Sequence, residues 1–301
     1  MGNSQMPPEL AAGQAGEAPK QLTHFNRGLF LKKKPARVES FWTESAHDGR
    51  RVQGWIMYPP DFDPEQEYPM LLEIHGGPFA HYGDYFSMEL QLYAARGYVV
   101  VYTNPRGSTG YGQEFGNLIH HAYPGNDYDD LMSCVDHVIG EGNIDEDRLY
   151  VTGGSGGGVL TAWIVGKTDR FRAAVSAKPV INWYTHALTA DGPAFFTRYW
   201  FPAMPWEDPD HYYARSPISL VGNVTTPTML LVGDKDYRTP LSEAEQYYRA
   251  LKLRGIETAL VRFPEASHGI AGRPSQMLAK IGAITGWMAK FGGPEEKPSQ
   301  P

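Results

Sequence analysis

A glycine-rich stretch runs Val151-Thr152-Gly153-Gly154-Ser155-Gly156-Gly157-Gly158, between an apolar run that begins at residue 148 and a helical pattern over residues 159–165. A strand, one sharp turn and a helix in this order hold a serine in strained geometry with its hydroxyl exposed. The turn needs glycine two residues to either side of the serine, where strand and helix approach closely. Gly153 and Gly157 meet that spacing, so the stretch predicts a nucleophile elbow at Ser155. Taken alone, it also fits a phosphate nest or a plain turn.

Two later segments offer the partners that a nucleophilic serine requires, a base to take its proton and a carboxylate to orient the base. They run Gly233-Asp234-Lys235-Asp236-Tyr237-Arg238-Thr239-Pro240 and Pro264-Glu265-Ala266-Ser267-His268-Gly269, and each follows a short β-prone run. Parallel strands end at the sheet edge where open α/β sheets bind ligands, so we expect Ser155, His268 and an aspartate to meet there. The order Ser, Asp, His is that of α/β-hydrolases. Spacing alone leaves both aspartates of the first segment open.

Backbone N–H donors must also be available for the negative oxygen of a tetrahedral intermediate. One normally comes from the residue after the nucleophile, here Gly156, and another from the loop after an earlier strand. Residues 71–79 read Leu-Leu-Glu-Ile-His-Gly-Gly-Pro-Phe, and the two glycines allow a substrate carbonyl to approach the backbone. The segment therefore predicts the second donor, although an ordinary strand-ending turn explains it equally well on its own.

The composition favours one well-buried α/β domain. The chain has 301 residues, 42% hydrophobic and 13% aromatic, with a formal net charge of −7. This charge argues against nucleic acid or an anionic membrane as the main partner. The sequence has no run of about 18 apolar residues, so we expect no membrane-spanning segment. The single cysteine, Cys134, allows no internal disulfide and lies in an amphipathic helical pattern, so we expect a structural thiol and a cytoplasmic protein.

Short β-prone runs alternate with helical patterns, which is typical of a wound α/β sheet. The first two runs are separated by a polar turn and predict an antiparallel hairpin. The others are almost continuously apolar, as in parallel strands that are covered on both faces. The fold class that we predict is a mostly parallel, eight-stranded α/β-hydrolase sheet with helices on both faces. Its strands are expected at residues 38–45, 52–58, 70–74, 98–103, 149–152, 173–177, 229–232 and 258–263.

The chain divides into a catalytic domain and two polar ends. Residues 1–24 are poor in large apolar side chains and are expected to form a disordered tail or a remnant of a preceding domain. Residues 25–291 form the predicted catalytic domain, and residues 292–301 a second disordered tail. Residues 180–226 are long, rich in proline and dense in aromatic side chains, which predicts a cap-like excursion or pocket wall.

A series of five motifs resembles that of the prolyl oligopeptidase family of serine peptidases, and most closely its acylaminoacyl-peptidase and dipeptidyl-peptidase-like catalytic domains. The motifs are His75-Gly76-Gly77-Pro78, Asn104-Pro105-Arg106-Gly107-Ser108-Thr109-Gly110-Tyr111-Gly112, the elbow, Asp236-Tyr237-Arg238-Thr239-Pro240 and Ser267-His268-Gly269. The resemblance spans residues 38–291. It implies the triad Ser155, Asp236 and His268, with an oxyanion hole from the amides of Gly77 and Gly156. Family members usually carry a β-propeller before this domain, so the chain is either a piece of a longer parent or a naturally short enzyme.

The resemblance implies a serine hydrolase that forms an acyl-enzyme and cleaves peptide or acyl-amino-acid bonds next to an apolar residue. A carboxylesterase with an open active site is the alternative, and a non-catalytic binding module a distant one. We expect no cofactor and no metal, because the other histidines lack zinc-ligand spacing. Arg106 could bind substrate or form a structural ion pair, and exposed aromatic side chains make a homo-oligomer possible. The predicted substrate-binding residues are Phe79, Trp183, Tyr184, Phe195, Phe196 and Trp200.

Overall fold

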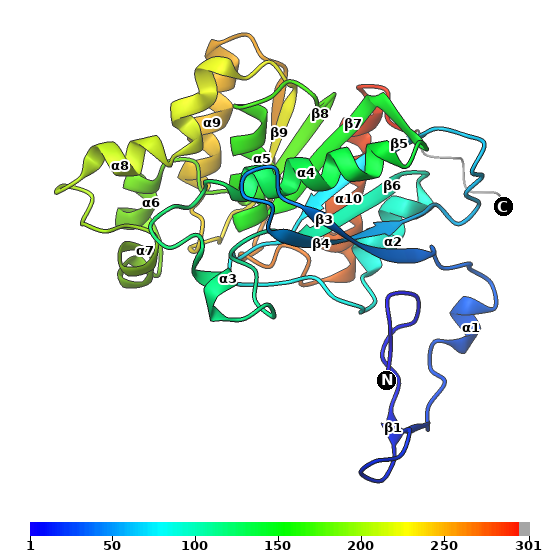
Figure 1. Cartoon of the computed structure of the whole chain (residues 1–301). Coiled ribbons are helices and arrows are strands. Elements are labelled where there is room, and N and C mark those ends of the chain that lie inside the picture. Colours follow the sequence, from blue (N-terminus) through cyan, green and yellow to red (C-terminus); the bar gives the residue numbers. More distant parts are fainter. Residues whose placement is uncertain (295–301) are drawn as a thin grey trace.

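The computed structural model describes residues 1–294 and contains an eight-stranded sheet with helices on both faces (Figure 1). The strands follow the order β10-β9-β8-β7-β5-β6-β4-β3 across the sheet. All neighbours are parallel except β4, which is antiparallel to β3 and to β6. The predicted fold class is confirmed. The strands are β3 (Val38–Glu44), β4 (Arg51–Met57), β5 (Tyr68–Ile74), β6 (Val99–Asn104), β7 (Ile144–Gly154), β8 (Ala173–Ala177), β9 (Thr228–Gly233) and β10 (Thr258–Phe263).

The strand sequences explain their places in the sheet. Every residue of β6, β8 and β9 is buried, because these strands are apolar on both faces and helices cover both faces. The edge strand β3 instead has no buried residue and consists of exposed and half-buried ones. The long strand β7 ends at the elbow, so the sheet delivers Ser155 to its carboxyl edge.

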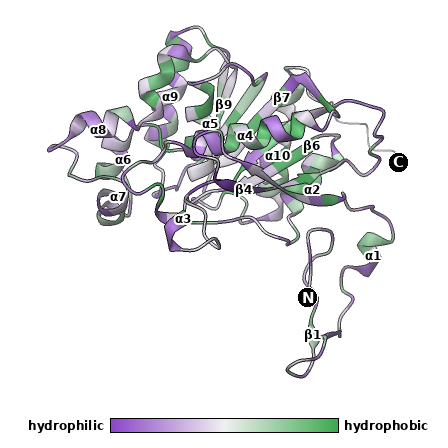
Figure 2. Cartoon of the chain, viewed as in Figure 1, coloured by the Kyte–Doolittle hydropathy of each residue, from purple (hydrophilic) through white to green (hydrophobic). Residues whose placement is uncertain are grey.

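Two hydrophobic clusters lie on opposite faces of the sheet. On one face, α2 and α10 pack against the strands through residues such as Tyr93 and Ile284. On the other face, α4, α5 and α9 do so through residues such as Leu131 and Tyr247. Hydrophobic residues gather on the strands and on the helix faces that meet them (Figure 2). The helices are α2 (Met88–Ala95), α3 (Gln113–Asn117), α4 (Asp127–Gly140), α5 (Gly156–Val165), α9 (Leu241–Leu253) and α10 (Pro274–Ala289).

The aromatic excursion between β8 and β9 is helical. It contains α6 (Trp183–Thr189), α7 (Pro193–Tyr199), α8 (Pro209–Ala214) and the 3-10 helix η1 (Pro217–Asn223). These helices lie together at one end of the molecule, beside α9 (Figure 1). Across residues 1–294, no helix combines the length and the apolar character that a bilayer crossing requires.

The N-terminal segment differs from the predicted disordered tail, because it forms a small hairpin of β1 (Ala11–Ala12) and β2 (Lys20–Gln21), followed by α1 (Arg27–Phe30). The side chain of Glu9 accepts a hydrogen bond from Thr23 Oγ1 at 2.5 Å, and the Ser4 amide donates to Asp84 at 2.8 Å. Polar side chains therefore order this segment where apolar burial does not. A remnant of a preceding domain stays a prediction. Most of the predicted C-terminal tail, residues 295–301, lies outside the described residues.

Candidate active site

The turn between β7 and α5 has the geometry of an elbow. Ser155 lies at φ 60° and ψ −118°, a conformation that costs a non-glycine residue about 1–3 kcal/mol. The flanking glycines allow β7, α5 and β5 to meet. A Cβ atom at Gly157 would lie 2.0 Å from the carbonyl oxygen of Ile74, and one at Gly153 would lie 2.7 Å from the backbone of Gly157. Only glycine fits at these two positions without moving the backbone.

The structure brings the three residues of the predicted triad together. Ser155 follows β7, Asp236 follows β9 and His268 follows β10, so all three lie at the carboxyl edge of the sheet. The Ser155 hydroxyl lies 3.0 Å from His268 Nε2. On the other side of the ring, His268 Nδ1 lies 2.8 Å from Asp236 Oδ2. An ionised carboxylate only accepts hydrogen bonds, so Nδ1 donates to it and Nε2 is left to accept from the serine.

Asp236 is held as a carboxylate by its neighbours. Burial raises the pKa of Asp236. Hydrogen bonds from His268 and from the amide and hydroxyl of Thr239 lower it by more than burial raises it, so the pKa lies below the usual value. The Arg238 amide donates to the same carboxylate at 3.0 Å. The other candidate, Asp234, pairs with Arg262 at 2.8 Å on the surface and does not reach the histidine.

Gly77 and Gly156 approach each other beside the serine. A Cβ atom at Gly156 would lie 3.0 Å from the Gly77 nitrogen and 2.9 Å from its carbonyl oxygen. Neither amide donates to an acceptor within the described part of the chain, so both are free for a substrate oxygen. The Gly156 carbonyl accepts from the buried Tyr123 hydroxyl at 2.9 Å, which holds the start of α5 in place. Sequence reasoning missed Tyr123, because it lies in a loop without a motif.

A cavity of about 310 Å³ opens beside Ser155 and His268. Five of the six predicted substrate-binding residues line it, namely Phe79, Trp183, Phe195, Phe196 and Trp200. Tyr184 lies outside the cavity lining and instead packs against Tyr212, with ring centroids 6.3 Å apart. The cavity also has lining residues that sequence reasoning did not propose: Tyr123, Val159, Val180, His186, Arg238 and Thr239.

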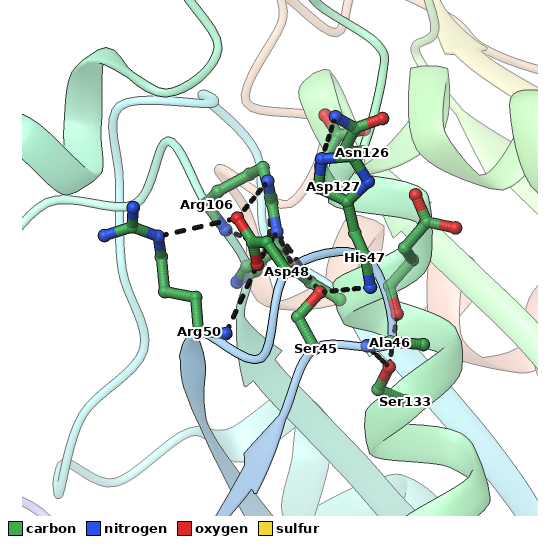
Figure 3. Close-up of polar contacts among 12 residues, drawn as sticks. Ser45, Ala46, His47, Asp48, Arg50, Arg106, Asn126, Asp127 and Ser133 are labelled. Atoms are coloured by element: carbon green, nitrogen blue, oxygen red, sulfur yellow. Dashed lines mark hydrogen bonds and ion pairs between the residues drawn. The ribbon is translucent and has the colours of Figure 1, made fainter.

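Arg106 lies away from this cavity in a buried ion-pair cluster (Figure 3). Only 4% of its side chain is exposed, and it pairs with Asp130 at 2.8 Å and with Asp48 at 3.0 Å. A hydrogen bond to Ser45 completes the cluster. The cluster joins the turn between β3 and β4 to the start of α4, so of the two roles considered for Arg106 the structure supports the ion pair. Among residues 1–294, no group of three or more His, Cys, Asp or Glu side chains is placed to hold a metal ion.

Relatives with similar sequences are peptidases. A model of the prolyl oligopeptidase family matches residues 84–294. The chain is 43% identical over 284 residues to the uncharacterized peptidase YuxL of Bacillus subtilis, covering 93% of this chain and 43% of that protein. It is 35% identical over 231 residues to the acylamino-acid-releasing enzyme of Arabidopsis thaliana, covering 74% of this chain and 30% of that protein.

Solved structures give the same picture. The acylaminoacyl peptidase of Pyrococcus horikoshii superposes with a TM-score of 0.91 at 28% identity, and the match covers 100% of this chain and 48% of that one. The chain thus spans less than half the length of these relatives. On the family match, which covers most of the sequence, and on the shared fold, the chain belongs to the prolyl oligopeptidase family of serine peptidases.

Proposed function

We propose that this protein cleaves peptide or acyl-amino-acid bonds next to an apolar residue, through an acyl-enzyme on Ser155. The observation that carries the proposal is the continuous hydrogen-bonded chain from Ser155 Oγ through His268 to Asp236, at the mouth of an aromatic cavity. A serine hydroxyl becomes a useful nucleophile only when a positioned base accepts its proton. The order of the three residues along the chain is that of other α/β-hydrolases.

The proposed reaction has two halves. Ser155 Oγ attacks the substrate carbonyl carbon while its proton passes to His268 Nε2, and the new oxyanion accepts hydrogen bonds from the Gly77 and Gly156 amides. His268 then gives the proton to the leaving amine, which breaks the C–N bond and leaves an ester on Ser155. Water attacks that ester by the same route in reverse and releases the acid. Asp236 stays ionised throughout, since its lowered pKa favours the carboxylate beside the imidazolium.

The cavity supports a preference for apolar groups. Its aromatic walls exclude water from an apolar side chain or acyl group, a transfer worth about 25 cal/mol for each Å² buried. Phe79 follows the oxyanion loop and its ring lies 5.7 Å from that of Trp200, so the two close one wall beside the reacting carbonyl. Tyr184 has no part in this proposal.

A matched pair of substrates tests the proposed class of reaction. We expect an N-acyl phenylalanine anilide and the corresponding ester to be hydrolysed with comparable kcat/KM, and both activities to vanish in Ser155→Ala. Turnover of the ester alone would favour a carboxylesterase. Failure of native, folded protein to react with a fluorophosphonate would favour a non-catalytic binding module.

A single aromatic side chain tests the pocket. Phe195 lines the cavity and is 45% exposed, whereas Tyr213 in the same excursion is 58% exposed and does not line it. We expect Phe195→Ala to lower kcat/KM for a bulky apolar acyl group by about 10-fold to 100-fold relative to an acetyl group, because the lost contact is worth about 1–3 kcal/mol. Tyr213→Ala is the control and should leave that ratio unchanged. An equal effect of both variants would contradict the placement of the pocket.

A further inference from the structure

A largely buried lysine lies behind the elbow and takes no part in the proposed chemistry. Lys178 follows β8 directly and adopts φ 42°, a conformation that is uncommon for a residue with a side chain. Its aliphatic stem crosses the backbone of the elbow, because a Cβ atom at Gly154 would lie 3.0 Å from Lys178 Cε. The stem therefore passes the elbow and brings the amino group to the loop that carries His268.

The Lys178 amino group donates a hydrogen bond to the carbonyl oxygen of His268 at 2.8 Å. Within the described part of the chain, this is the only hydrogen bond that the backbone of His268 makes. Glu265 and Ile270, on either side of the histidine, have positive φ values of 58° and 37°. A β-branched residue in that region is a true outlier, so the loop needs contacts from outside to keep its shape.

Charged neighbours surround the amino group and shift its pKa in both directions. Burial lowers the pKa of Lys178, and Lys280 lowers it further, while Asp236, Glu89 and Glu73 act in the opposite direction. Lys280 itself pairs with Glu89 at 2.5 Å. The two lysines thus share one cluster of charges, but only Lys178 is bonded to the histidine loop.

We propose that Lys178 is a positioning residue, which ties the His268 loop to the nucleophile elbow and so sets the imidazole between Ser155 and Asp236. This inference rests on the proposed function of the triad. Lys178 does not line the substrate cavity, so its loss acts on the proton transfer and leaves substrate binding alone. Displacing a reacting group by about 1 Å can cost about 100-fold in rate.

Three lysine variants test the proposal on an activated ester. We expect Lys178→Met to lower kcat and the rate of fluorophosphonate labelling by about 10-fold to 100-fold, with KM unchanged. Lys178→Arg keeps a charged donor and should recover most of the loss. Lys280→Met removes a charge from the same cluster without touching His268, and it should keep the native kcat. Native-like kcat in folded Lys178→Met, or an equal loss in Lys280→Met, would overturn the proposal.

A second variant covers the case in which Lys178→Met does not fold. Gly154→Ala keeps Lys178 in the chain but puts a methyl group 3.0 Å from its Cε atom, so the stem must shift, and Gly154 does not have a positive φ. We expect a fall in kcat without a change in KM here too, and a native kcat would overturn the proposal. Ser155→Ala distinguishes a failure of the proposed function from a failure of the role proposed for Lys178. If that variant retains full activity, the proposed function itself fails. If it is inactive while Lys178→Met is native-like, only the role of Lys178 fails.

Discussion

At the scale of single residues, the contact between Asp236 and His268 sets which ring nitrogen of the proposed catalytic base carries the proton. The carboxylate accepts from Nδ1 at 2.8 Å and so leaves Nε2 unprotonated toward the serine at 3.0 Å. Asp236→Asn puts an amide in place of one acceptor oxygen. The asparagine NH₂ group can donate to Nδ1, which favours the tautomer that carries the proton on Nε2. Nε2 can then no longer accept the proton of the serine.

We expect Asp236→Asn to lower kcat by about 10⁴-fold while KM changes little. Steady-state kinetics on an activated ester measures both constants, and thermal unfolding shows whether the variant is folded. The exposed neighbour Asp234 provides the control, since Asp234→Asn breaks only an ion pair with Arg262 at the surface. If the two variants lost the same activity, the assignment of the carboxylate would be wrong.

Asp127 is a buried carboxyl group whose ionisation opposes folding. Burial raises its pKa to about 7, and its Oδ2 atom has no hydrogen-bond partner among the described residues. In the unfolded chain an aspartate has a pKa of about 3.9. The folded state therefore holds the proton more tightly, and the contribution of Asp127 to the free energy of unfolding falls as pH rises from about 4 to 7.

Asp127→Asn removes this dependence, because the asparagine carbonyl can still accept from the amides of Gly125 and Tyr128. The free energy of unfolding of the variant, relative to the native protein, should therefore rise by about 2–3 kcal/mol between pH 5 and pH 8. Urea unfolding at the two pH values measures this difference. A difference that is the same at both pH values would show that Asp127 does not titrate in this range.

At the scale of elements, the elbow is fixed by close contact of strand and helix more than by helix propensity. Gly157 belongs to α5 and Gly286 to α10, yet a Cβ atom at Gly157 would lie 2.0 Å from Ile74 O, and one at Gly286 would meet nothing within 4 Å. We expect Gly286→Ala to stabilise the protein by about 0.5–1 kcal/mol, as alanine does in an exposed helix.

Gly157→Ala should instead destabilise the protein by more than about 3 kcal/mol or prevent folding, because the backbone of β5 cannot move away from the helix. Urea unfolding of the two alanine variants compares the same substitution in two helices. Equal and small effects would mean that α5 does not pack against β5 as closely as the structure shows.

Much of the sheet could be predicted from the sequence, because a short, almost continuously apolar run is typical of a parallel strand that is covered on both faces. The start of β7 could not be predicted. It begins at Ile144, before a polar run that includes Asp145 and Arg148, since pairing with Tyr68 of β5 extends the strand beyond its apolar part. Local composition carries no information about pairing with a strand that is distant in the sequence, so it could not predict where β7 begins.

The site shows the same limit. Trp183 and Tyr184 are neighbours in an aromatic segment, so composition assigned both to the pocket. In α6, successive residues point about 100° apart around the helix, and of these two neighbours Trp183 lines the cavity whereas Tyr184 does not. The two aspartates after β9 also look alike in sequence, and the position of His268 in space distinguishes them. Order along the chain thus predicts the triad, whereas the pocket wall depends on how the helices of residues 180–226 are turned.

At the scale of the whole molecule, the eight-stranded sheet explains how residues 155, 236 and 268 meet although more than a hundred positions separate the first from the last. Parallel strands deliver their carboxyl ends to one edge, and the helical excursion adds an aromatic wall there. The chain spans less than half the length of these relatives.

Trapping the acyl-enzyme shows whether Ser155 is the nucleophile. Native protein is mixed with an activated ester, quenched in acid within the first turnover and digested, and the acylated peptide is identified by mass spectrometry. We expect a burst of product equal to the enzyme concentration and one acyl group on Ser155, with kcat lower by about 10⁶-fold in Ser155→Ala. An acyl group on another residue, or full turnover in Ser155→Ala, would contradict this expectation.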